Sequence, residues 1–181
     1  MTTTNTPSPT PTEIAAARAQ LHEFAAHYDY DTGYLENLLD RSPAAHATFA
    51  AAMGMSHHRA VLPVDVHMVA RLATLRADDC GACTQLNLRM AVEAGVDREL
   101  LRTVLERPEA LPPVHRLAYE HAQTVVRGEN GDPEVVRALE KALGSAAFAE
   151  LCVAIVGSRI YPALKRALGQ EHACRVPSLD F

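Results

Sequence analysis

Two cysteines stand three residues apart in the segment ADDCGACTQLNLRMAVEAG, residues 77–95, of a 181-residue chain that holds four cysteines. A thiol pair at this spacing can cycle between dithiol and disulfide, supply half of a metal site, or pack as two small hydrophobic side chains. Gly81 and Ala82 are small, and we expect them to leave both sulfurs uncovered and to permit a Cys80–Cys83 disulfide. This pair is the first candidate for chemistry.

The reactivity of the pair depends on the helix that follows it. The apolar pattern predicts a helix from about Asp79, which would place Cys80, Cys83 and Asn87 on one face. The positive end of a helix dipole acidifies a nearby thiol, and this favours Cys80 as the more acidic of the two. Asp78 and Asp79 oppose that effect, because negative charge disfavours a thiolate. The sequence leaves open which cysteine attacks.

A metal site would need two ligands beyond the pair. His172 and Cys174, in QEHACRV, would complete a Cys₃His set, but no spacing in the chain requires it, and we expect no metal. Cys152 lies in the most apolar segment and is expected in the core. Cys174, in a polar tail, is the candidate for a third redox thiol.

Composition narrows the class of protein. A chain of this length can bury a core without metals or disulfides. A net charge of −5, a pI near 6.0 and the absence of a basic cluster argue against nucleic-acid binding. The start MTTTNTPSPTPT has no secretory signal, and no apolar run looks long enough to span a bilayer. We therefore expect a cytoplasmic protein, and in the reducing cytosol a C-x-x-C pair favours redox cycling or metal ligation over a permanent crosslink.

The elements that must position the pair are helices, because the apolar residues recur with a helical period almost throughout the chain. We therefore predict an all-α fold. Gly95 is expected to close the cysteine helix in a left-handed conformation. Helix starts are predicted at Thr10 with Pro11 and Glu13, at Ser42-Pro43, Leu62-Pro63, Asp97, Pro112-Pro113 and Asp132-Pro133.

The last helix, residues 145–169, is apolar nearly all round between Ala146 and Val156, as expected in the middle of a bundle or in an oligomer interface. Pro162 is expected to kink or split it. The predicted organisation is a disordered leader over 1–10, a helical extension over 11–58, a core over 59–170 and a tail over 171–181.

Residues 62–95, LPVDVHMVARLATLRADDCGACTQLNLRMAVEAG, resemble the helix–C-x-x-C–helix signature of the carboxymuconolactone decarboxylase / alkylhydroperoxidase D-like (AhpD-like) family, and the likeness continues to about Gly169. The resemblance implies an AhpD-like bundle of antiparallel helices that assembles as a homo-oligomer, commonly a trimer or hexamer. It implies that Cys80 and Cys83 are catalytic and that no cofactor is needed.

The peroxidase branch of that family carries a glutamate before the first cysteine and a histidine after the second, which form a proton relay. Here those positions hold Met68 and Asn87, and neither side chain can take a proton. His67, His115 and His121 are candidates for a compensating base. We expect His67, about 100° around the helix from Met68, to face solvent and His121 to lie in the core.

Two functions from different classes follow. The first is a thiol–disulfide oxidoreductase of the alkylhydroperoxidase type, which reduces a small-molecule peroxide or disulfide, takes electrons from a thiol reductant protein and is weakened by the missing relay. The second is a non-catalytic oligomeric binding or structural protein on the same scaffold. The decarboxylase branch, which acts on a lactone, is a further alternative, but it lacks the C-x-x-C pair.

Overall fold

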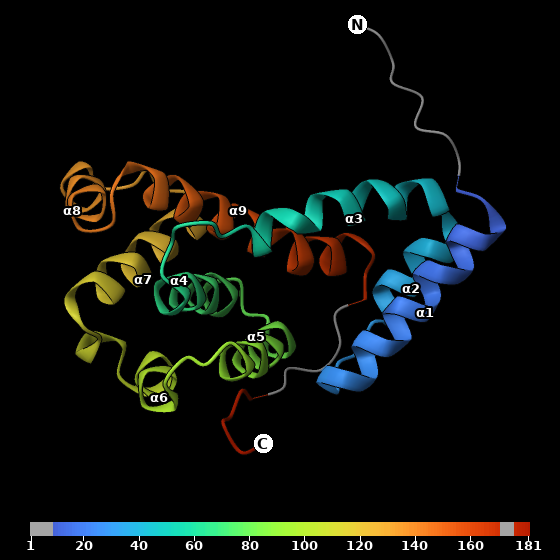
Figure 1. Ribbon diagram of the computed structural model, residues 1–181, viewed down its shortest axis with the longest axis horizontal. Helices are drawn as coiled ribbons and strands as arrows, with labels where there is room; N and C mark the ends of the chain where they lie inside the picture. Colours follow the sequence, from blue (N-terminus) through green and yellow to red (C-terminus); the bar gives the residue numbers. More distant parts are fainter. Residues whose placement is uncertain (1–8, 171–175) are drawn as a thin grey trace, which may run out of the picture. The chain divides into compact units, whose positions relative to one another are not determined.

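The computed structural model describes residues 9–170 and 176–181. This part of the chain is all helical and has no strand, which confirms the predicted all-α class (Figure 1). The predicted disordered leader lies almost wholly outside the described residues. The helices are α1 (Pro11–Tyr28), α2 (Gly33–Arg41), α3 (Pro43–His57), α4 (Val64–Ala77), α5 (Gly81–Glu93), α6 (Arg98–Glu106), the 3₁₀ helix η1 (Pro108–Ala110), α7 (Pro113–Val126), α8 (Pro133–Leu143) and α9 (Ser145–Ala167).

Local capping signals place the helix ends close to where the sequence predicts them. Thr10 and Glu13 form a capping box at the start of α1: the Thr10 hydroxyl accepts from Glu13 N at 3.3 Å, and the Glu13 carboxylate accepts from Thr10 N at 2.7 Å. Asp97 and Asp132 are simpler N-caps of α6 and α8, whose side chains accept from Leu100 N and Glu134 N. Gly95, with φ 81°, ends α5 in the left-handed conformation.

The chain forms two compact units, Met1–Met53 and Gly54–Phe181, and α3 runs through the boundary. In the smaller unit α1 packs against α2, with Leu21 and Leu39 among the buried side chains. An ion pair of 2.5 Å between Arg18 and Asp40 joins the two helices. The larger unit contains the cysteine pair.

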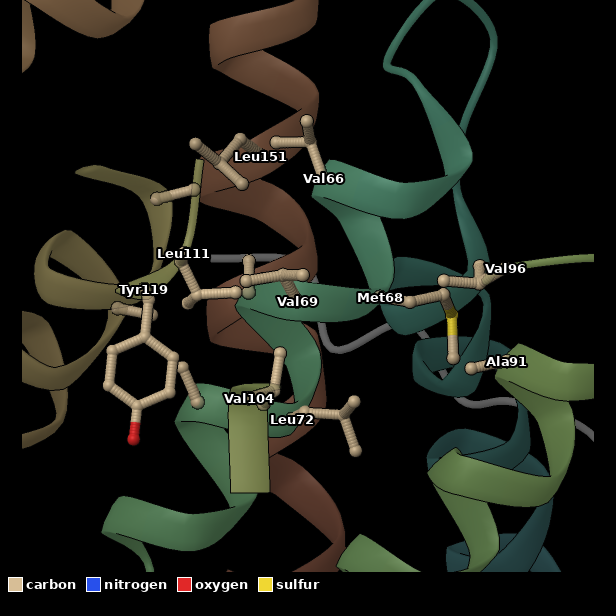
Figure 2. Close-up of a cluster of buried hydrophobic side chains, with 14 of the residues drawn as sticks. Val66, Met68, Val69, Leu72, Ala91, Val96, Val104, Leu111, Tyr119 and Leu151 are labelled. Carbon is tan, nitrogen blue, oxygen red and sulfur yellow. The ribbon is translucent and has the colours of Figure 1, made fainter. Parts of the chain in front are cut away.

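Helix α4 lies at the centre of the larger unit, where it packs against α5, α7 and α9 (Figure 1). Every residue from Val66 to Leu75 is buried. Figure 2 shows the apolar cluster around this helix, with Met68 directed toward Ala91 and Val96. A helix buried on all sides has no solvent-facing stripe, so its polar side chains must find partners inside the protein.

Helix α9 packs one side against α4 and leaves the other side open. Leu151, Ala154 and Ile155 are buried, whereas Val153 and Val156 are 37% and 50% exposed. The predicted burial on all sides therefore does not occur within the part of the chain that the structure describes. The sequence prediction that no apolar run could span a bilayer is wrong by length and composition, because α9 is long and apolar enough to do so. It is the one such helix in the described part of the chain, and its inner side packs against the rest of the protein.

Pro162 does not split α9, which continues from Ser145 to Ala167. A proline removes one N–H donor, and the hydrogen bonds on either side of it maintain the helix. One turn earlier, α9 meets the last turn of α3 at Gly157, where a Cβ atom would lie 2.5 Å from Ser56 N. Only glycine permits this backbone contact, and a hydrogen bond of 2.8 Å between Ser56 Oγ and Tyr161 Oη lies beside it.

A carboxylate on α9 fixes the segment that leads into α4. The Glu150 side chain accepts from the backbone N–H groups of Ala60, Val61 and Leu62 at 3.0, 3.0 and 2.8 Å. These bonds, chiefly the one from Leu62, lower the pKa of Glu150 below its ordinary value. The negative charge of Glu150 is thus matched by three N–H donors ahead of the N-terminus of α4.

We predict that Glu150→Gln lowers the free energy of unfolding at neutral pH, because an amide cannot accept all three N–H bonds. A lowered carboxyl pKa stabilises the fold above the ordinary value of about 4.3, and that contribution is lost as the pH falls through the lowered pKa. The deficit of the variant should therefore be largest at pH 7 and shrink below about pH 4. Chemical denaturation across this range measures it. Glu140→Gln, at an exposed position of α8, is the control, and an equal effect there would contradict the assignment.

Candidate active site

The cysteine pair lies at a reversal between α4 and α5. Helix α4 ends in a Schellman motif, in which Cys80 N donates to Leu75 O at 3.0 Å and Asp79 N donates to Arg76 O at 3.1 Å. Asp79 takes the left-handed position of this motif with φ 52°, a conformation that Asp adopts more readily than most residues. Cys80 is then the N-cap of α5, and its carbonyl accepts from Thr84 N at 2.9 Å. One tight turn therefore fixes the backbone of Cys80.

The helix begins at Gly81, two residues later than predicted, so Cys80 stands just outside it. Cys80 and Cys83 are joined in a disulfide, with 5.3 Å between their Cα atoms. Cys83 is 2% exposed, whereas Cys80 is half-buried. The expectation that both sulfurs are uncovered is wrong for Cys83, because the inner face of α5 packs against α4.

A pocket of about 270 Å³ opens onto Cys80. It lies at the reversal between α4 and α5, and the C-terminal residues Val176 and Pro177 close one side of it. A small reactant can therefore reach Cys80 from this pocket, whereas Cys83 is not among its lining residues. The lining residues are Arg76, Asp79, Cys80, Gly81, Thr84, Val176 and Pro177.

The two aspartates before the pair have different surroundings. The Asp78 carboxylate is 7% exposed and lies 3.4 Å from Arg159 Nε and 3.3 Å from Arg166 Nη2. Arg166 also donates to Asp78 O at 3.0 Å. Because two guanidinium groups offset Asp78, its charge opposes a Cys80 thiolate less than the sequence suggests. Asp79 is exposed and lines the pocket, so its carboxylate is the acidic group beside Cys80.

Asn87, at the position where the resemblance to the AhpD-like family leads one to expect a histidine, lies one turn after Cys83 and is buried. Its Nδ2 donates to Cys83 O at 2.9 Å, and its Oδ1 has no hydrogen-bond partner among the described residues. Met68, at the position where the same resemblance leads one to expect a glutamate, belongs to the apolar core. Asn87 thus supports the backbone of the second cysteine, and neither position supplies a base.

His67 is 4% exposed, so the expectation that it faces solvent is wrong: α4 has no exposed side. Burial, with a smaller contribution from the nearby Arg71, lowers the pKa of His67 to about 4. The ring is therefore neutral at pH 7. Its electrostatic neighbours also include Ser56, His57 and Arg59, and it does not line the pocket of Cys80.

The two other candidate histidines lie on α7. His121 is buried as predicted, and burial lowers its pKa. Its ring packs against Gly131 and lies 5.8 Å, centroid to centroid, from Phe148. His115 Nε2 is 2.9 Å from Asp65 Oδ2. Neither histidine lines the pocket of Cys80.

Cys152, the other cysteine among the described residues, does not join the pair. Cys152 is a free thiol, half-buried rather than fully in the core, and burial raises its pKa. Cys174 and His172, the candidate metal ligands, lie outside the described residues. Within residues 9–170 and 176–181, no three side chains of His, Cys, Asp or Glu gather as a metal site.

The sequence interpretation missed several residues of the pocket. Arg76 could have been predicted from the sequence, because it precedes Cys80 by four residues and occupies the last turn of α4. Thr84 could have been predicted by the same rule, because it follows Cys80 by four residues. Val176 and Pro177 gave no signal, because they reach the pocket only through the tertiary fold.

Comparisons with known proteins identify no relative of this chain: no family model, no curated protein and no solved structure matches it.

The left-handed conformation of Asp79 generates a prediction about the turn. Asp79→Gly should leave the free energy of unfolding within about 1 kcal/mol of the wild-type value, whereas Asp79→Val should lower it by about 1–2 kcal/mol, because a β-branched side chain disfavours positive φ. Thermal and urea unfolding of the two variants provide the measurement. Equal stabilities would show that the turn does not require this conformation.

Proposed function

We propose that this chain is a thiol–disulfide oxidoreductase of the alkylhydroperoxidase type, with Cys80 as the attacking thiol and Cys83 as the resolving thiol. The observation that carries the proposal is the asymmetry of the pair: Cys80 lines a pocket, whereas Cys83, to which it is bonded, is buried and is not among the lining residues. An incoming reactant meets Cys80 first. The disulfide partner is already within bonding distance.

The proposed cycle begins with reduced cysteines. The Cys80 thiolate attacks the terminal oxygen of a hydroperoxide, the O–O bond breaks, and the alkoxide leaves as an alcohol after taking a proton, so that Cys80 becomes a sulfenic acid. The Cys83 thiol then attacks the Cys80 sulfur and releases water as the disulfide forms. A dithiol reductant attacks Cys80, displaces the Cys83 thiolate and leaves as its own disulfide. A disulfide substrate enters by the same attack of Cys80.

Two features of the structure favour a thiolate at Cys80. Cys80 is the N-cap of α5 and therefore stands at the positive end of the helix dipole, although in the disulfide its side chain accepts none of the free N–H groups of the helix. Arg76 lines the same pocket, and its guanidinium donates to Val104 O. A cation and a helix N-terminus both lower a thiol pKa. They supply electrostatic activation in place of a proton relay.

The family positions Met68 and Asn87 supply no general base, so the rate should follow the thiolate fraction of Cys80. We propose a peroxide reduction slower than a relay would permit, with thiol–disulfide exchange retained. The proposal includes an AhpD-like bundle, a homo-oligomer such as a trimer or hexamer, and a cytoplasmic location.

A non-catalytic scaffold is the second candidate, and one observation favours it. The exposed side of α9 carries Val153 and Val156, which a second subunit could cover. In that function the cysteines would be structural. Reaction of the reduced pair with reactants from solution separates the two candidates.

We predict that the reduced full chain consumes cumene hydroperoxide and that Cys80→Ser abolishes the first turnover. Cys83→Ser should retain the first turnover, because the attacking thiol remains, but should not form the intramolecular disulfide. Stopped reactions followed by mass spectrometry report the sulfenic acid and the disulfide. Peroxide consumption by Cys80→Ser equal to that of the wild type would exclude the assignment, and inert cysteines throughout would favour the scaffold.

The charged side chains beside Cys80 predict two shifts of its thiol pKa in opposite directions. In a Cys83→Ser, Cys152→Ser, Cys174→Ser chain, Arg76→Gln should raise the pKa of the Cys80 thiol and Asp79→Asn should lower it, each by up to about one unit. The pH dependence of alkylation by iodoacetamide measures this pKa. Arg102→Gln, which removes an exposed arginine on α6, is the control. Shifts of the same sign in the Arg76 and Asp79 variants would contradict the electrostatic account.

A further inference from the structure

Residues Val176–Phe181, which we call the strap, lie beside α5 and α6 (Figure 1). Gln85 of α5 bonds the strap in both directions: its Nε2 donates to Ser178 O at 3.0 Å, and its Oε1 accepts from Ser178 N at 2.8 Å. A side-chain amide here pairs with the backbone as a neighbouring strand would. The strap is thus held by directional bonds and not by proximity alone.

Two further contacts anchor the strap beyond Ser178. Leu179 packs against the hydrophobic core. Arg98 donates to Leu179 O and to Phe181 O, and the Phe181 ring lies 5.4 Å from Arg89 and 5.3 Å from Arg98, measured from the guanidinium carbon to the ring centroid. Cation–π contacts of this kind hold an aromatic ring at the protein surface.

The near end of the strap forms part of the wall of the active-site pocket. Val176 and Pro177 line the 270 Å³ pocket together with Cys80, and they also line a second pocket of about 410 Å³ with Arg76 and Arg102. The strap therefore lies between the two pockets and contributes to the wall of each. Its position sets the size of the opening through which Cys80 is reached.

We propose that the strap determines which reactants exchange with Cys80, a role that rests on the proposed function. Docked, it leaves a pocket that admits small peroxides, thiols and disulfides. A protein dithiol carries its thiol on a broad surface and must bring that thiol into line with the Cys80–Cys83 bond. The docked strap excludes that surface, so reduction by a protein partner requires the strap to leave Gln85.

The test compares a small and a large reductant on the oxidised full chain. Dithiothreitol and thioredoxin each reduce the Cys80–Cys83 disulfide, and quenching with an alkylating reagent followed by mass spectrometry gives the rate. Gln85→Leu removes both bonds to Ser178 and should raise the thioredoxin rate about tenfold, since each lost hydrogen bond shifts the docking equilibrium several-fold. The dithiothreitol rate should change far less. Gln123→Leu, which removes a glutamine bonded instead to Tyr119 Oη, should leave both rates unchanged.

A second variant guards against misfolding at the buried position 85. Phe181→Ala truncates a side chain that is 44% exposed and should raise the same rate ratio in a smaller degree. An unchanged ratio of thioredoxin to dithiothreitol rates in a folded Gln85→Leu chain, or in Phe181→Ala if the former does not fold, overturns the strap's role. A pair that neither reductant reduces, in any variant, overturns the proposed function and the strap's role with it.

Discussion

Helix α4 has no side that faces water from Val66 to Leu75, and the larger unit is arranged to satisfy this condition. A fully buried helix still presents polar groups at both ends, and α9 supplies charges for each. Glu150 meets the N–H groups that precede the first turn, and Arg159 and Arg166 meet Asp78 after the last turn. Negative charge at the amino end and positive charge near the carboxyl end also complement the helix dipole.

These contacts fix the direction of the two helices. The early part of α9 binds the segment before α4, and the late part of α9 binds the end of α4, so the two run in the same sense. The predicted antiparallel arrangement therefore does not hold for this pair. The reason is the long connection through α5–α8, which returns the chain to the end from which α4 began.

The packing around α4 also explains why the two cysteines are buried to different degrees. The reversal at Asp79 follows directly from the end of α4, and the inner face of α5 must pack against the same helix. Cys83 lies on that inner face, whereas Cys80 precedes the helix and stays half-buried. The different accessibilities of the two sulfurs are thus a result of packing, and they give a physical basis for the different roles that we propose for them.

Local chemistry made much of the fold predictable. The caps at Thr10, Asp97 and Asp132 and the left-handed Gly95 depend on a few neighbouring residues, and each lies where the sequence predicts it. The disulfide spacing was equally readable. The sequence did not predict the interactions between distant segments, which are the burial of His67, the bonds of Glu150 to residues 60–62, and the approach of the strap to Cys80. No local pattern encodes a partner that lies ninety residues away in the chain.

The matched contacts of α4 and α9 have a consequence for how this chain can vary in length. The same number of residues separates Leu62 from Asp78 as separates Glu150 from Arg166, so the two contacts require equal spacing along α4 and along α9. A single inserted residue advances a helix by about 1.5 Å and turns it by about 100°. An insertion in one helix alone would move a charged side chain away from the group that it bonds. The two helices can therefore change in length only if both change by the same number of residues.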